Sequence, residues 1–308
     1  MKSSLFLASL IATPWAMQPD VMHAYAKVLA RQYAHKLEAA DHRDDTQYDD
    51  AGVPITAAAP RQAQRTASGS IAVVPLRGTI MPRASMLEMC GGGTSVETFT
   101  AALRSAMADE TVSQILIDID SPGGSVYGIG ELAAEIRAAR AVKPVVGIAN
   151  HVAASAAYWA GSACTELYVT PGGQVGSIGV IAAHEDMSKM LAAEGVNVTL
   201  ITAGKFKAEG NPYGPLDEEA LRSIQADIDS YYADFTGAVA KGRGVSVEAV
   251  RKNMGQGRML RGDAALANQM VDGVATFDDV VKKMQRNAKA SSGRSALRAA
   301  RNELSLIG

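Results

Sequence analysis

The chain has little cysteine, no large excess of one charge and no long apolar run. Its 308 residues include 2 cysteines and carry a formal net charge of −2. Two cysteines do not make a disulfide framework in a chain of this length, so we expect a reducing compartment. The small net charge gives no broad basic surface for nucleic acid. The five histidines show no His-x-x-x-His spacing, so we expect neither a metal site nor a cofactor.

The two ends of the chain leave alternatives open. The apolar stretch 5–12 follows Lys2 and is far shorter than the roughly 20 residues that span a bilayer. We therefore expect no stable membrane span, although a cleaved signal peptide is an alternative. At the other end, basic residues predict a solvated or helical tail, with an interaction arm as the alternative. These residues are Lys282, Lys283, Arg286, Lys289, Arg294, Arg298 and Arg301.

Short apolar runs alternate with helical patterns from residue 71 onward. We expect an amphipathic helix over 19–37 and a mobile, Asp-rich linker over 38–70 before them. The alternation predicts a layered α/β fold with a mainly parallel sheet. The expected strands are 71–76, 115–119, 145–149, 166–169 and 198–201. The expected helices are 94–108, opened by a Thr/Ser-x-x-Glu capping box at 94–97, then 129–140, 185–194, 217–241, 247–253 and 262–270.

A glycine pair follows one of the expected strands, in Asp120-Ser121-Pro122-Gly123-Gly124. Glycines allow a turn in which backbone N–H groups point outward, and such groups near a helix start can stabilise an oxyanion. Taken alone, the same residues also fit an ordinary turn between a strand and a helix.

Ser155 and Lys207 are the strongest candidates for chemistry. Ser155 lies among small residues at an expected helix start, where exposed nucleophiles recur, although the segment is not Gly-x-Ser-x-Gly. A serine needs a base, and a lysine acts as one when burial disfavours its ammonium form. Judged alone, Ser155 also reads as one small residue in a packed helix. Glu209, two residues after Lys207, would oppose that role on an extended segment.

Taken in order, the glycine pair, Ser155, Gly176-Ser177-Ile178-Gly179-Val180 and Lys207 closely resemble the S49 family of serine peptidases, over roughly 71–280. The resemblance implies a crotonase-like (ClpP-like) fold and a Ser/Lys dyad. Ser155 would be the nucleophile and Lys207 the general base, oriented by Ser177. The oxyanion hole would comprise Gly123, Gly124 and the N–H of Ala156.

Within the family, two segments resemble the phage capsid-assembly type: Thr13-Pro14-Trp15-Ala16-Met17 and the stretch 203–213. This implies cleavage of scaffold, portal or capsid proteins during head maturation, a homo-oligomer, and a place in the host cytoplasm or prohead interior. Residues 38–70 are a candidate self-cleavage region. The expected division is an N-terminal helix and linker (1–70), a peptidase domain (71–285) and a basic tail (286–308).

Other assignments stay open at this stage. Lys205 is a second candidate base. His184 with Asp186 would make a Ser-His-Asp triad, and His151 is expected to shape the edge of the cleft. Two other functions are alternatives: a bacterial envelope peptidase that degrades signal peptides, and an assembly protein of the same fold without peptidase activity.

Overall fold

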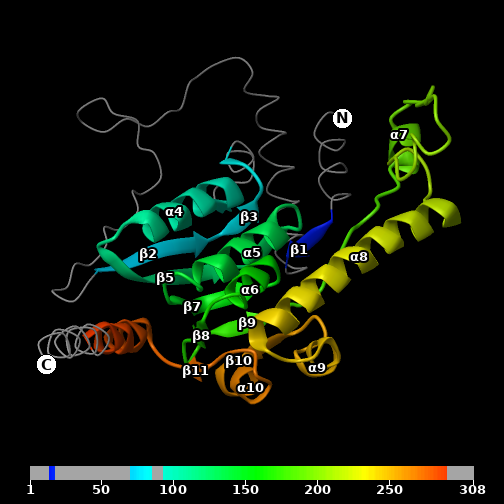
Figure 1. Ribbon diagram of the computed structural model, residues 1–308. Helices are drawn as coiled ribbons and strands as arrows, with labels where there is room; N and C mark the ends of the chain where they lie inside the picture. The colour runs from blue at the N-terminus through cyan, green and yellow to red at the C-terminus, as the bar shows by residue number, and fades with distance from the viewer. Residues whose placement is uncertain (1–13, 18–69, 85–92, 290–308) are drawn as a thin grey trace, which may run out of the picture.

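A computed structural model describes residues 14–17, 70–84 and 93–289. The expected helix over 19–37 and nearly all of the expected linker over 38–70 lie outside these residues. Figure 1 shows a layered body of sheets and helices from which a long helix, α8, leads away to one side.

The main sheet is mostly parallel. Five strands lie in the order β10-β9-β7-β5-β2, and β8 pairs with both β7 and β11. Only β10 runs antiparallel, to β9. These strands are β2 (Ser70–Arg77), β5 (Val112–Ser121), β7 (Val145–Ala154), β8 (Glu166–Val169), β9 (Gln174–Gly176), β10 (Met259–Arg261) and β11 (Gly273–Val274).

A second sheet lies beside the glycine pair, in the order β1-β6-β3-β4. It consists of β1 (Trp15–Met17), β6 (Gly123–Ser125), β3 (Thr79–Met81) and β4 (Gly93–Ser95). β6 is central and runs antiparallel to β1 and parallel to β3. The glycine pair is therefore part of a short strand rather than of a free loop.

Helices cover both faces of the main sheet (Figure 1). α4 (Val96–Ala108), α5 (Ile129–Ala139) and α6 (Ala156–Gly161) pack on one face, where Ile115, Ile117 and Ile119 of β5 join the larger core. The alternate residue Leu116 points to the other face, where Val280 and Met284 of the helix 277–289 cover it. This alternation is the period of two that a strand imposes.

The remaining helices lie toward the C-terminal part. They are α7 (Ser188–Ala193), α8 (Glu218–Arg243), α9 (Val247–Asn253) and α10 (Gly262–Ala267). The expected layered α/β fold, with its mainly parallel sheet and helical C-terminal part, is confirmed. The helix 277–289 runs across residue 285, and its Ala288 is 7% exposed. The division of the chain at 285 stays a prediction.

Two local expectations are wrong. No strand forms over 198–201, where Ile201 is 95% exposed, because β-forming side chains need a neighbouring strand to pair with and pack against. At α4 the N-cap is Ser95, whose hydroxyl accepts the Thr98 N–H at 3.0 Å. Thr94 belongs to β4, and its hydroxyl bonds the backbone of Arg77 instead.

Candidate active site

Ser155 lies at the junction of β7 and α6 with a strained backbone. Its φ is 53° and its ψ is −118°, a region that residues with a Cβ rarely adopt. Among the described residues only four non-glycines have positive φ, and two of them are Ser155 and Ser177. Such strain persists only where the surrounding structure enforces it, and it concentrates at functional sites.

Packing behind Ser155 holds this junction. Trp159 stacks on Phe235 of α8 with ring centroids 4.6 Å apart, and the buried Tyr158 hydroxyl donates to the Met270 carbonyl at 2.9 Å. The Trp159 N–H donates to the Ser155 carbonyl at 2.8 Å. α6 is thus held by two contacts with other parts of the core, and its first backbone bond starts at Ser155, so the position of the serine is set by the core.

The segment that carries Ser177 lies directly against Ser155. The Ser155 N–H donates to the Gly176 carbonyl at 2.7 Å, and its hydroxyl lies 3.4 Å from the Gly179 carbonyl. β9 positions this segment by pairing Gly176 with Ala154 of β7. Ser177 itself is 7% exposed. The structure therefore brings together the two serines that the sequence singled out.

The glycine pair reaches the serine from the other side. A Cβ on Gly123, whose φ is +102°, would stand 3.1 Å from the Ser155 Cβ. A Cβ on Gly124 would stand 1.9 Å from the Ile80 carbonyl oxygen of β3. Gly123 is required because its φ is positive, and Gly124 is required because a side chain there would collide with the β3 backbone. The Gly123 N–H donates to the Ser121 hydroxyl at 3.2 Å. The Ala156 N–H begins α6, whose N-cap makes no side-chain hydrogen bond.

Lys207 belongs to a segment outside the strands and helices that hold Ser155. It is exposed, on a loop between α7 and α8, and Figure 1 shows α7 and its flanking loops at the far end of α8. Within the described residues no hydrogen bond or ion pair joins the Lys207 side chain to Ser155, Ser177 or Glu209, and Glu209 is also exposed. Lys205 forms an exposed ion pair with Glu219 at 2.7 Å.

The two histidines are used elsewhere. His184 Nε2 lies 2.9 Å from the Asn211 carbonyl oxygen. Asp186 is exposed, and hydrogen bonds from Ser188 lower the pKa of its carboxyl group. His151 is an exposed residue within β7, with its Nδ1 3.0 Å from Asp120. None of these groups has a hydrogen bond to Ser155 in the described structure.

Two further findings limit the chemistry of the described residues. Burial raises the pKa of the Cys164 thiol to about 12, so it carries almost no thiolate at neutral pH and is a poor nucleophile. The parts of the chain that the structure covers hold no group of side chains suited to a metal ion. They also contain no helix long and apolar enough to cross a membrane.

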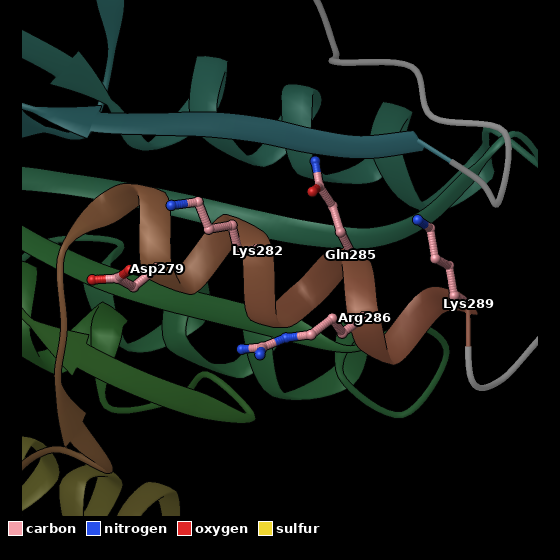
Figure 2. Close-up of a pocket in the computed structure, with 5 residues that line it drawn as sticks. All are labelled: Asp279, Lys282, Gln285, Arg286 and Lys289. Atoms are coloured by element: carbon pink, nitrogen blue, oxygen red, sulfur yellow. The ribbon is translucent and has the colours of Figure 1, made fainter.

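Two hollows differ in character and place. One, of about 340 Å³, lies between the segment 180–184 and the first half of α8 and is mainly apolar, with Ile181, Leu221 and Ile224 in its wall. The other, of about 400 Å³, follows the helix 277–289, where Figure 2 shows Lys282, Arg286 and Lys289 spread along the helix. The first hollow begins at Val180, next to the Gly179 carbonyl that lies near the Ser155 hydroxyl. The second lies along the helix 277–289, which covers the opposite face of the sheet.

Comparison with known proteins identifies the family. The family model of peptidase family S49 matches residues 137–291, which include Ser155, Ser177 and Lys207. This chain belongs to peptidase family S49. The expected family is thereby confirmed.

Individual relatives add phage proteins to the comparison. The chain is 35% identical to the head-tail preconnector protein GP5 of Enterobacteria phage P21, over 73% of this chain and 44% of that protein. It is 33% identical to the capsid assembly protease C of Escherichia phage lambda, over 76% of this chain and 54% of that protein. The chain thus spans about half the length of these relatives.

Among solved structures, a point mutant of ClpP1 from Listeria monocytogenes matches with a TM-score of 0.43 and 14% identity. The match covers 67% of this chain and 92% of that one.

Sequence reasoning missed one part of the site. The segment Trp15–Met17 lies beside the glycine pair and Ser155, held by β6 on one side and Ile181 on the other. The segment Thr13-Pro14-Trp15-Ala16-Met17 resembles the phage type, but nothing in the sequence indicates the distant strands with which it pairs.

Proposed function

We propose that this chain is a serine endopeptidase of the head-maturation type, in which Ser155 attacks a peptide carbonyl and Lys207 is the base. The observation that carries the proposal is the buried Ser155 at a strained strand-to-helix junction, facing Gly123, in a member of family S49. Similarity to a phage capsid assembly protease and to a head-tail preconnector protein supports scaffold, portal or capsid proteins as substrates. Its place of action would be the host cytoplasm or the prohead interior.

The chemistry is acyl transfer in two steps. The Ser155 oxygen bonds to the peptide carbonyl carbon while its proton passes to the uncharged Lys207 amine. The carbon–nitrogen bond then breaks, the proton moves to the leaving amine, and water later hydrolyses the acyl-enzyme. Backbone N–H groups among Gly123, Gly124 and Ala156 would stabilise the oxyanion, and Ser177 would orient the lysine. The Gly123 N–H must exchange its bond to Ser121 to take part.

The dyad requires Lys207 to move relative to Ser155. Contact with the enclosed Ser155 site would remove the lysine amine from water, and such desolvation favours the neutral form. Either the loop between α7 and α8 folds back within one chain, or the lysine comes from a second copy. The second route agrees with the homo-oligomer that we expect.

One set of variants tests the dyad and its origin. Ser155→Ala and Lys207→Ala are each expected to lose at least about 100-fold in cleavage of a co-expressed capsid or scaffold protein, the range general bases supply. Recovery of activity on mixing the two purified variants places the lysine on another copy, and no recovery places it on the same chain. Loss in His184→Ala with full activity in Lys207→Ala contradicts the dyad.

A second candidate function has one observation in its favour. The exposure of the Lys207 side chain fits an assembly protein of this fold without peptidase activity. In that case Ser155→Ala behaves as wild type in both head assembly and cleavage assays. The envelope peptidase stays an alternative that cell fractionation decides.

A further inference from the structure

The N-terminal strand β1 lies between two strands that belong to the candidate site. On one side Trp15, Ala16 and Met17 pair antiparallel with Ser125, Gly124 and Gly123 of β6. On the other side the Trp15 N–H donates to the Ile181 carbonyl at 2.8 Å, and the Ile181 N–H donates to the Trp15 carbonyl at 3.0 Å. β1 thus fills a slot that is one strand wide.

This slot runs past the nucleophile. The point at which a Cβ on Gly123 would stand lies 2.2 Å from the Ala16 carbonyl oxygen and 3.1 Å from the Ser155 Cβ. The backbone of Ala16 and the side chain of Ser155 therefore border the same small space. The three residues of β1 are 0 to 6% exposed, so the strand is enclosed rather than resting on the surface.

A peptide substrate must occupy such a position to react. Its carbonyl must come within about 3 Å of both the nucleophile and the oxyanion donors. Extended peptides bind by adding a strand to exposed sheet edges, here those of β6 and of the segment at Ile181. β1 takes both edges, so no second peptide can pair there while it is bound.

We propose that residues 14–17 are an intramolecular blocking strand, which occupies the peptide groove beside Ser155 and must leave before a substrate enters. The proposal rests on the proposed function in one respect: the peptide that enters when the strand leaves is called a substrate. The ligand class that it names is an extended, apolar peptide with a small residue opposite Gly124, because that is the chemistry of Trp15-Ala16-Met17. The apolar hollow at Ile181 borders the same slot.

Ala16→Pro is the most direct way to release the strand. Trp15 uses its N–H and carbonyl on Ile181, so those of Ala16 face β6, since successive residues of a strand alternate. Proline removes that N–H and does not fit a paired strand. Ala16→Ser keeps the amide and nearly the size, and is the matched control. Ala16→Glu is a second releasing variant, because an unpaired carboxylate does not stay in a site that is 0% exposed.

The first measurement is the rate at which a fluorophosphonate probe labels Ser155 in the full chain. If the open state holds about 1–10% of the molecules, release raises this rate by about 10- to 100-fold in Ala16→Pro and Ala16→Glu, and leaves Ala16→Ser unchanged. A Trp15→Cys/Ile181→Cys pair gives the converse test: the oxidised disulfide blocks labelling and reduction restores it, while the same treatments leave the wild type unaffected. Equal and measurable labelling rates in the wild type and both releasing variants overturn the proposal.

A binding measurement separates this proposal from the proposed function. In a Ser155→Ala background, a fluorescent peptide of residues 12–19 is expected to bind the Ala16→Pro protein, and to bind the parent and Ala16→Ser proteins at least about tenfold more weakly. A peptide with proline at position 16 is the control and binds none of them. Binding without probe labelling in any variant refutes the peptidase while the blocking strand stands. Equal peptide binding by parent and Ala16→Pro proteins refutes the blocking strand.

Discussion

Ser155 combines a catalytic candidate with a strained backbone, and the two properties can be measured separately. A residue with a Cβ at φ 53° and ψ −118° costs on the order of 1–3 kcal/mol relative to an unstrained conformation. Glycine adopts this region without that cost. The packing around Ser155 must therefore offset this free-energy cost to hold the residue in its strained conformation.

Ser155→Gly is therefore expected to be inactive and more stable than Ser155→Ala. Both variants lack the hydroxyl, so their difference reports the backbone. Glycine relieves the backbone strain but adds entropy to the unfolded chain, and these two contributions oppose each other. We expect the free energy of unfolding of Ser155→Gly to exceed that of Ser155→Ala by about 1 kcal/mol. Urea unfolding followed by circular dichroism measures it. An alanine variant as stable as the glycine variant speaks against the strain.

Gly124→Ala is expected to damage both stability and activity. Its Cβ would stand 1.9 Å from the Ile80 carbonyl oxygen, so β6 and β3 must separate, and we expect a loss of more than about 3 kcal/mol. Gly172 has nothing within 4 Å of an added Cβ, and Gly172→Ala is the matched control. Thermal unfolding of the two variants compares them. Equal stability would mean that β6 and β3 do not approach as described.

At the scale of elements, an ion pair fastens the end of α8 to the sheet behind Ser155. Arg243 donates to both carboxylate oxygens of Asp272 at 2.8 and 3.0 Å, and Asp272 also accepts the Leu167 N–H at 2.7 Å. Burial opposes ionisation of Asp272, but these hydrogen bonds outweigh it and lower the pKa of the carboxyl group. The pair thereby connects α8 to β8.

This pair predicts a loss of stability in acid. Because the folded-state pKa of Asp272 lies below its unfolded value, its contribution is complete above the unfolded value near pH 3.9 and disappears as the pH falls through the folded value. Asp272→Asn is expected to cost about 1–3 kcal/mol at pH 7 and to unfold with a weaker dependence on pH below 4. Urea titrations at pH 7 and pH 3 measure both. An unchanged pH dependence contradicts the assignment.

The sequence predicted elements well where local signals decide them. The buried runs of β5 and β7 and the long amphipathic α8 carry their own periodicity, and Ser155 was placed correctly at a helix start. Pairing between strands that are distant in sequence has no local signal. The pairing of β1 with β6 was therefore missed, and a strand was wrongly expected over 198–201, where no partner strand exists in the described structure. The serines and glycines were found by their order along the chain. The position of Lys207 depends on the direction in which the loop between α7 and α8 projects, and no local sequence pattern predicts that direction.

At the scale of the whole molecule, the segment between α7 and α8 presents apolar side chains to solvent. Ile201, Phe206 and Leu200 are 95, 51 and 44% exposed, on the same loop as Lys207. Exposed apolar clusters of this kind often mark contacts between proteins. In the proposed homo-oligomer these side chains would contact a neighbouring copy, and Lys207 on the same loop would lie toward it.

Ile201→Glu is accordingly expected to reduce the assembly to smaller species without changing the thermal midpoint of the single chain by more than about 2 °C. Val142, 66% exposed in the turn after α5, supplies the control variant Val142→Glu. Sedimentation velocity gives the masses. The same large assembly in both variants would show that this loop does not mediate association.

Chemical labelling of the nucleophile shows whether Ser155 is the reactive serine. Full-length protein is treated with a fluorophosphonate, digested, and mapped by mass spectrometry, beside Ser155→Ala and Ser162→Ala, which removes another buried serine of the same region. We expect one adduct, on Ser155, present in Ser162→Ala and absent in Ser155→Ala. An adduct on another residue, or one that survives in Ser155→Ala, would contradict this expectation.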